Sequence, residues 1–191
     1  MPRLAKMSLV AIVNGEPKDL SAKVTEDCTV HFLSGTDDKG LHVLRHSSAH
    51  LLAHAVKRLY PDAKFGIGPA IANGFYYDID CKETFTPDSL VAIEKEMRRI
   101  VAENHPIERM DVTRDQAMEL FKDEPYKIQL LERFPAATNI SIYKQGEFMD
   151  LCMGPHVPST AKLKAFKLQS VAGAYWLGDE KNKMLQRIYG L

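Results

Sequence analysis

The segment from Arg45 to Tyr60 constrains the fold of this chain more than any other. Its apolar residues recur at the spacing of one helix face, and Pro61-Asp62 follows directly, so the sequence predicts a long helix that ends near Tyr60. Such a face implies a hydrophobic core. With 191 residues, 45% of them hydrophobic, the chain can bury a core without disulfides or a structural metal.

Strands and further helices follow this helix without strict alternation. Residues 64–80 predict two strands around a turn at Asn73-Gly74, and Thr86-Pro87 predicts the start of a helix that runs to about Asn104. The remaining expected elements are a strand at 107–112, helices at 113–122 and 126–132, and a strand-rich stretch at 138–190. The predicted class is α+β, with a mixed or antiparallel sheet and packed helices.

Residues 1–40 predict a small β-rich module with turns at 14–17 and 34–40. The apolar run Ser8–Val13 is interpreted as a buried strand, because it is too short for a signal peptide and lacks a small-residue cleavage site. We therefore divide the chain into a module at 1–40 and a domain at 41–191. About 40 residues are marginal as an independent fold, so the module is expected to lean on its neighbour or to be incomplete.

Composition and charge limit the cellular compartment and the kinds of partner that we expect for this chain. Three widely spaced cysteines do not form a disulfide framework, which predicts a reducing, cytoplasmic setting. No apolar run reaches the ~18 residues of a membrane span, so no membrane partner is expected. The formal net charge is zero, but residues 159–191 carry six basic and two acidic residues. A polyanion would approach that region; the alternative is a solvated face without a partner.

Three histidines lie four residues apart on the predicted long helix, at positions 46, 50 and 54. Successive members share a helix face, about 6 Å apart along the axis. A single such histidine is usually a packing residue, whereas two on one face suit a metal pair or a pair that orients water. His54 is expected to be a core or supporting residue.

A second cluster runs from Asp150 to His156. Gly154-Pro155 disfavours a regular helix, so Cys152 and His156 are expected to converge from a loop. Together with His46 and His50 they form a plausible zinc set of three histidines and one thiolate. The alternative is a metal-free polar pocket in which neutral imidazoles hold and deprotonate a water. The residues by themselves leave both possibilities open.

Several motifs resemble those of bacterial-type threonyl-tRNA synthetases, in the same order along the chain. They read HSSAHLLAHA from His46, IGPAIANGFYYD from Ile67, DLCMGPHVP from Asp150, and AGAYWLGD with NKMLQRIYG from Ala172. Alanyl-tRNA editing proteins share the histidine and Cys–His pairs and commonly bind zinc through them. Their second pair typically reads CGGTH, whereas this chain has CMGPH, which favours the threonyl branch.

The resemblance implies the editing domain of that family, with site residues at matching positions. The catalytic set it implies is His46, His50, Lys127, Asp150, Cys152 and His156. Gly68 and Tyr143 are expected to contact the substrate together with Asp150. In that branch the pocket is thought to work without a metal, so no cofactor is expected for editing; zinc, if present, would sit at the His/Cys cluster. Tyr175 and Trp176 could stack on the terminal adenosine, but core packing is the favoured interpretation.

The implied function is proofreading in protein biosynthesis: hydrolysis of the ester of mischarged seryl-tRNA(Thr) by an activated water, with rejection of threonyl-tRNA. The implied partner is the acceptor end of tRNA(Thr), and the parent ligase is expected to be a homodimer. Residues 7–40 resemble only the second half of the family's ubiquitin-like TGS module. The ATP-dependent core with its own zinc site is expected to be absent from this chain. The alternatives are a zinc-dependent alanyl-type deacylase and a catalytically inert RNA-binding module.

Overall fold

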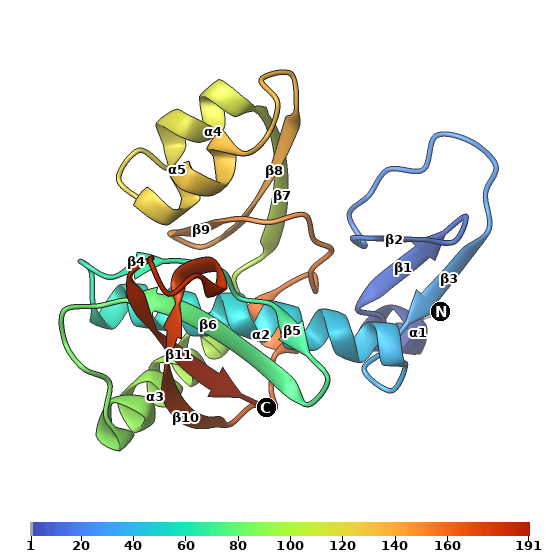
Figure 1. Ribbon diagram of the computed structural model, residues 1–191. Helices are drawn as coiled ribbons and strands as arrows, with labels where there is room; N and C mark the ends of the chain where they lie inside the picture. Colours follow the sequence, from blue (N-terminus) through green and yellow to red (C-terminus); the bar gives the residue numbers. More distant parts are fainter. Residues whose placement is uncertain (1) are drawn as a thin grey trace.

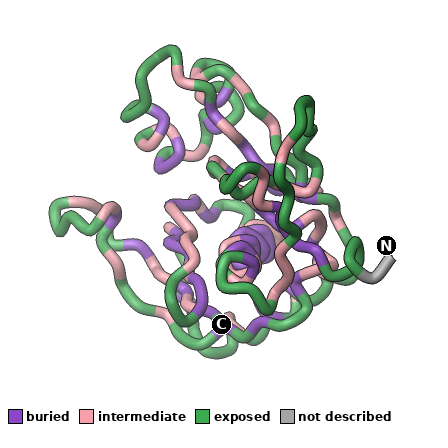
Figure 2. Tube along the Cα trace, turned by 90° about the vertical axis from the view of Figure 1, so that its right-hand side faces the viewer, coloured by how far each residue is buried: buried purple, intermediate pink, exposed green. Residues whose placement is uncertain are grey.

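The computed structural model describes residues 2–191, and its fold is α+β, as predicted. Three antiparallel sheets pack with helices around one long central helix, α2 (Asp38–Leu59), which Figure 1 shows crossing the molecule. Viewed end-on, α2 lies at the centre of the fold and carries much of its buried surface (Figure 2). None of the helices in the described chain is long and apolar enough to cross a membrane.

The small sheet near the N-terminus has the strand order β2-β1-β3. Its strands are β1 (Val10–Val13), β2 (Glu16–Lys18) and β3 (Val30–Leu33). The prediction of strands alone for residues 1–40 was incomplete, because α1 (Pro2–Met7) precedes them. A six-residue helix is too short to show helical periodicity. Leu9 and Val10 are buried in the main core, so the small sheet does pack on its neighbour.

Helix α2 is longer than the apolar periodicity predicted. It begins at Asp38, with Asp37 as its N-cap, and ends before Pro61 as expected. Gly40 permits this start, because a Cβ at that position would lie 1.9 Å from the carbonyl oxygen of Ser34. The division that we predicted at residue 40 therefore falls within the first turn of α2.

The second sheet covers one side of α2, in the order β10-β11-β6-β4, with β5 paired to β6. Its strands are β4 (Lys64–Phe65), β5 (Ala70–Ile71), β6 (Gly74–Asp80), β10 (Leu168–Tyr175) and β11 (Met184–Gly190). Residues 64–80 thus form three strands rather than the predicted two, because the regular ladder is interrupted at the glycine- and proline-containing segment 66–69. Backbone hydrogen bonds from this segment to β6 nevertheless continue.

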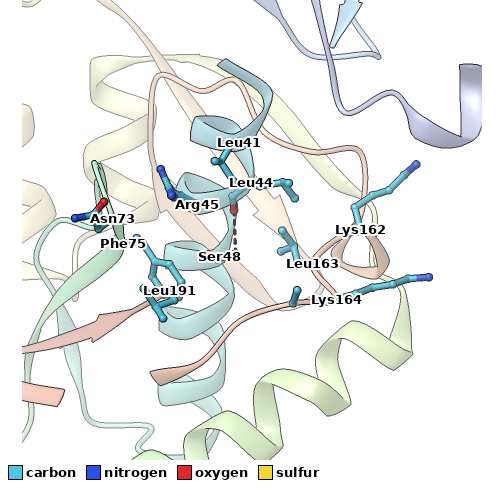
Figure 3. Close-up of a pocket in the computed structure, with 12 residues that line it drawn as sticks. Leu41, Leu44, Arg45, Ser48, Asn73, Phe75, Lys162, Leu163, Lys164 and Leu191 are labelled. Atoms are coloured by element: carbon cyan, nitrogen blue, oxygen red, sulfur yellow. Dashed lines mark hydrogen bonds between the residues drawn. The ribbon is translucent and has the colours of Figure 1, made fainter. Parts of the chain in front are cut away.

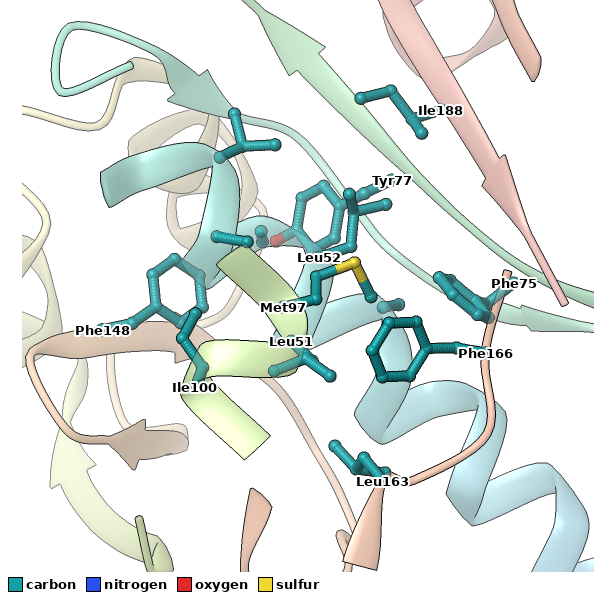
Figure 4. Packing of buried hydrophobic residues seen from close by; sticks show 14 of the residues in the cluster. Leu51, Leu52, Phe75, Tyr77, Met97, Ile100, Phe148, Leu163, Phe166 and Ile188 are labelled. Atoms are coloured by element: carbon teal, nitrogen blue, oxygen red, sulfur yellow. The ribbon is translucent and has the colours of Figure 1, made fainter. Parts of the chain in front are cut away.

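Helix α3 (Pro87–Glu103) packs against both α2 and β10, and it begins where Thr86-Pro87 predicted. Its Met97 and Ile100 meet Leu51 and Leu52 of α2 in the main core, with Phe75, Tyr77 and Ile188 from the second sheet (Figure 4). Each fully buried side chain of this size contributes about 1.5–3 kcal/mol relative to an exposed one. This core packs α2 against both the second sheet and α3.

The third sheet has the order β7-β8-β9, from β7 (Ile107–Thr113), β8 (Asn139–Gln145) and β9 (Phe148–Leu151). Helices α4 (Arg114–Leu120) and α5 (Pro125–Glu132) cover one face of it, close to the predicted ranges. The remaining elements are two short 3₁₀ helices, η1 (Thr160–Lys162) before β10 and η2 (Trp176–Gly178) between β10 and β11. All three cysteines are free, in agreement with the absence of a predicted disulfide framework.

Candidate active site

The two histidine-bearing segments meet where α2 passes the end of β9. His46 and His50 project from one face of α2, with ring centroids 5.1 Å apart, and the ring of His156 lies 4.4 Å and 4.3 Å from them. Sγ of Cys152 lies 3.3 Å from Nε2 of His46 and 3.2 Å from Nε2 of His156. The segment after β9 is an irregular loop, as predicted, and Gly154 there adopts a positive φ of 71°. The structure therefore brings these four predicted residues together.

A buried ion pair lies beside this cluster. Nζ of Lys127, on α5, is 2.5 Å from Oδ1 of Asp150, on β9, and the side chains are 3% and 2% exposed. The ammonium also donates hydrogen bonds to the carbonyl of Gly66 and to the hydroxyl of Tyr77. Oδ2 of Asp150 accepts a hydrogen bond from the Tyr77 hydroxyl at 2.5 Å and lies 3.5 Å from Nε2 of His50.

A cavity of about 180 Å³ opens onto this arrangement. Its walls come from α2, the segment 67–69, Tyr77, α5 and the end of β9; they are His46, His50, Ile67, Gly68, Pro69, Tyr77, Lys127, Asp150, Leu151 and Cys152. Gly68 has no room for a side chain, because a Cβ there would lie 2.2 Å from the ring of Tyr77. The cavity thus combines a fixed carboxylate and ammonium with two imidazoles and a thiol.

Burial keeps the ionisable groups of the cluster neutral. Desolvation lowers the pKa of His46 to about 4, and it lowers the pKa values of His50 and His156 well below their ordinary value. Burial raises the pKa of the Cys152 thiol to about 12. At pH 7 and without a metal, the cluster therefore offers neutral imidazoles, which can accept a proton, and a protonated thiol.

Sequence comparison shows which known proteins this chain resembles. Residues 140–189 match the family described as the threonyl and alanyl tRNA synthetase second additional domain. Threonine–tRNA ligases of Clostridium tetani (strain Massachusetts / E88) and Carboxydothermus hydrogenoformans are 58% and 57% identical to the chain, over 99% and 100% of its length. These similarities support the assignment of the chain as a threonyl-tRNA synthetase editing region. It spans about 30% of the length of these relatives.

The four donor atoms of the editing region could hold a metal ion. One ligand atom from each of His46, His50, Cys152 and His156 lies within 4.8 Å of the other three. Tetrahedral zinc binds histidine nitrogen at about 2.0–2.1 Å and cysteine sulfur at about 2.3 Å, so this donor set is compact enough for zinc after small adjustments. Binding would require the thiolate form of Cys152, and burial raises the pKa of this thiol to about 12 in the metal-free protein. The geometry and the neutral imidazoles both permit a metal, which would itself deprotonate the thiol on binding.

Tyr143 does not line the cavity of the editing region; it lies behind the loop that follows β9. Its ring centroid is 4.5 Å from that of His156, and its hydroxyl donates a hydrogen bond to Asp19. A Cβ at Gly154 would lie only 1.9 Å from the Tyr143 oxygen, so the loop packs directly on this side chain. In this structure Tyr143 supports the wall that carries His156.

Two polar residues of the site were not singled out from the sequence. Tyr77 holds the Lys127–Asp150 pair, and Oγ of Ser47 lies 2.9 Å from Nδ1 of His156 while accepting a hydrogen bond from the Val157 amide. Strand alternation in 74–80 could have placed Tyr77 with the buried Phe75 and Ile79. Helical spacing could have placed Ser47 beside the histidines, because it lies one residue after His46 and three before His50.

His54 and Trp176 are packing residues. His54 is fully buried, stacks on Phe148 and lies 3.0 Å from Glu147, away from the cluster. Trp176 is 2% exposed and packs with Tyr126, so the favoured interpretation of core packing is confirmed for Trp176. For Tyr175 that interpretation was wrong, because its side chain is 41% exposed. A second cavity of about 300 Å³ lies between the start of α2 and Leu163 (Figure 3). None of the predicted site residues lines it.

Proposed function

We propose that this editing region hydrolyses the ester that joins serine to tRNA(Thr), using a water molecule activated in the cavity. The observation that carries the proposal is the position of Asp150, whose carboxylate lines the cavity together with His46 and His50. Its Oδ1 pairs with Lys127 and its Oδ2 accepts a hydrogen bond from Tyr77, so the carboxylate is fixed in place. A fixed, buried carboxylate is a suitable partner for the α-ammonium group of an aminoacyl ester.

The imidazoles supply the base. Nε2 of His46 contacts the sulfur of Cys152, whereas no ring hydrogen bond is found for His50 among the described residues. We therefore assign water activation to His50, with His46 beside it. A neutral imidazole takes the proton as the water oxygen attacks the ester carbonyl. The terminal ribose oxygen then leaves and acquires a proton.

Lys127 stabilises negative charge that develops on the carbonyl or leaving oxygen. Its ammonium is held in place by Gly66, Tyr77 and Asp150. A donor fixed before the reaction needs no reorganisation in the transition state. Cys152, with His156 packed against its sulfur, forms the wall that receives the serine side chain, and steric contact with the additional methyl group excludes threonine. Binding differences of about 1–3 kcal/mol per methylene explain why a second, hydrolytic selection is needed.

The proposed partner is the acceptor end of tRNA(Thr). Part of the predicted basic surface is already neutralised, because Lys167, Lys183 and Arg187 pair with carboxylates. Lys164 and Lys181 are exposed. Charge therefore contributes modestly, and recognition of the ester within the cavity carries the specificity. Ligation of threonine is the activity for which the longer relatives are named, and our proposal concerns ester hydrolysis alone.

A deacylation assay tests the proposal. The 191-residue chain should hydrolyse seryl-tRNA(Thr) much faster than threonyl-tRNA(Thr), and His50→Ala and Lys127→Met should each reduce the rate by at least about tenfold. His31→Ala, an exposed histidine of the small sheet, is the matched control and should retain full activity. Near-normal rates for both site variants would exclude this site.

The zinc-dependent deacylase is the second candidate, because the four donor atoms lie together. We propose that no metal is needed, so a chelator should leave the rate unchanged and zinc should be substoichiometric in the same sample. One zinc per chain, with loss of activity on chelation and loss of zinc in Cys152→Ala, would support the second candidate. Salt-sensitive tRNA binding without any ester cleavage would instead support an inert RNA-binding module.

A further inference from the structure

One carboxylate reaches the cluster from outside the domain that carries the histidines. Asp19 directly follows β2 in the small sheet and is partly buried. Its Oδ1 accepts a hydrogen bond of 2.8 Å from the backbone amide of His156, and its Oδ2 accepts one of 2.7 Å from the hydroxyl of Tyr143. Figure 1 shows the loop after β9 extending towards the small sheet.

One of these bonds holds the loop itself, and the other holds the side chain on which the loop packs. Tyr143 supports the loop from below through its contact with Gly154, and the His156 amide lies two residues further along the chain. A single carboxylate therefore fixes both the loop and the residue that packs under it. Burial and the hydrogen bond to Asp19 raise the pKa of Tyr143, so its hydroxyl keeps the proton that it donates.

His156 connects this loop to the other two imidazoles of the cluster, those of His46 and His50. The ring of His156 is held between Ser47 on α2 and the sulfur of Cys152, and it packs against His46 and His50. Because these rings are in van der Waals contact, a displaced His156 displaces its neighbours. A shift of about 1 Å in a catalytic group can cost up to ~100-fold in rate.

We propose that Asp19 is a positioning residue of the editing site, so that the small sheet forms part of the catalytic architecture rather than a separate attachment. This inference rests on the proposed function for its kinetic consequence, but its structural consequence is independent of any activity. Other contacts join the two parts as well, since Leu9 and Val10 enter the main core and Nζ of Lys162 donates to the Lys6 carbonyl. Among the described residues that precede α2, Asp19 is the one whose side chain bonds directly to a member of the cluster.

Kinetics of conservative variants separate positioning from general stability. Asp19→Ala should lower kcat for seryl-tRNA(Thr) hydrolysis by about tenfold or more, with KM changed much less. Asp19→Asn should restore most of kcat, because its amide oxygen still accepts from His156 and its amide nitrogen can donate to Tyr143. Glu16→Ala, an exposed carboxylate on β2, is the control and should behave as the unaltered chain. An unchanged kcat in Asp19→Ala, or equal losses in all three variants, would overturn the proposal.

An NMR measurement on the same 191-residue chain separates failure of this inference from failure of the proposed function. Asp19→Ala should remove the exchange protection of the His156 amide and shift the imidazole resonances of His46, His50 and His156, while Glu16→Ala should leave them in place. These shifts are expected even if the chain hydrolyses no ester. If Asp19→Ala does not fold, Asp19→Asn combined with Tyr143→Phe carries the test. Unperturbed imidazole signals in the folded variants would refute a positioning role.

Discussion

Lys127 and Asp150 form an almost fully buried ion pair, with Nζ 2.5 Å from Oδ1, between α5 and β9. Each charge has further partners: Gly66 and Tyr77 for the ammonium, and Tyr77 with His50 for the carboxylate. A pair of this kind contributes little net stability relative to apolar side chains, but removal of one partner leaves a buried charge uncompensated. The ion pair is therefore better explained by a role in the chemistry of the site than by a contribution to stability.

Replacement of one member of this pair should be costly for stability. Lys127→Met keeps the volume and removes the charge, and we expect the free energy of unfolding to fall by about 3–5 kcal/mol, because Asp150 loses its buried ionic partner. Lys127→Met/Asp150→Asn should be more stable than Lys127→Met, since asparagine still accepts from Tyr77 without a charge. Urea unfolding of the unaltered chain, both single variants (Lys127→Met and Asp150→Asn) and the double variant measures this; purely additive losses would contradict the coupling.

Stability should decrease as the pH falls below about 6.5. Burial lowers the pKa of His46 to about 4 and lowers the pKa values of His50 and His156 well below their ordinary value, so the unfolded chain binds protons that the folded chain does not. Each such histidine costs about 1.4 kcal/mol per pH unit between pH ~6.5 and its folded pKa. Urea titrations from pH 7 to 5, with a chelator present, measure this loss.

Two variants assign that pH dependence to the cluster. His46→Gln should make the decrease between pH 6 and 5 shallower by about 1.4 kcal/mol per pH unit, whereas His31→Gln, on the exposed face of the small sheet, should not change it. A stability that does not vary between pH 7 and 5 in the unaltered chain would show that these imidazoles are not desolvated.

Cys152 should not act as a covalent nucleophile. Burial raises the pKa of its thiol to about 12, so the thiolate population near pH 7.5 is negligible in the metal-free protein. We expect slow alkylation of Cys152 by iodoacetamide, rapid alkylation after unfolding, and a Cys152→Ser variant that retains hydrolysis to within about tenfold. Mass spectrometry of a rapidly quenched reaction provides the decisive measurement, because a seryl adduct on Cys152 would contradict the water mechanism.

Gly154→Ala should damage the site more than its backbone conformation alone explains. Gly154 and Gly178 have nearly the same positive φ, 71° and 72°, which costs an alanine about 1–2 kcal/mol at either position. A Cβ at Gly154 also meets the Tyr143 hydroxyl at 1.9 Å, whereas nothing lies within 4 Å of a Cβ at Gly178. Gly178→Ala should therefore show the strain alone, and Gly154→Ala should lose more stability and most of the hydrolysis. Equal thermal shifts in the two variants would argue against the close packing.

Local signals in the sequence predicted most elements of the fold. Thr86-Pro87 identified the start of α3 because a cap and a first-turn proline act within one helical turn. The four-residue spacing of His46 and His50 placed them on one face because the helical period determines it. Where such signals were weak, the expectations missed: six residues of α1, the first turns of α2, and the third strand within 64–80.

By itself, then, the sequence determined which residues share a helix face, where the helices end, and that a second set of polar residues lies in a loop. Only the tertiary structure decided that Lys127 from α5, Tyr77 from β6 and Asp150 from β9 meet at one cavity. It also decided that Asp19 reaches His156 across 137 residues of chain. Such contacts depend on how the sheets pack around α2. Periodicity and capping act over a few residues and carry no information about that packing.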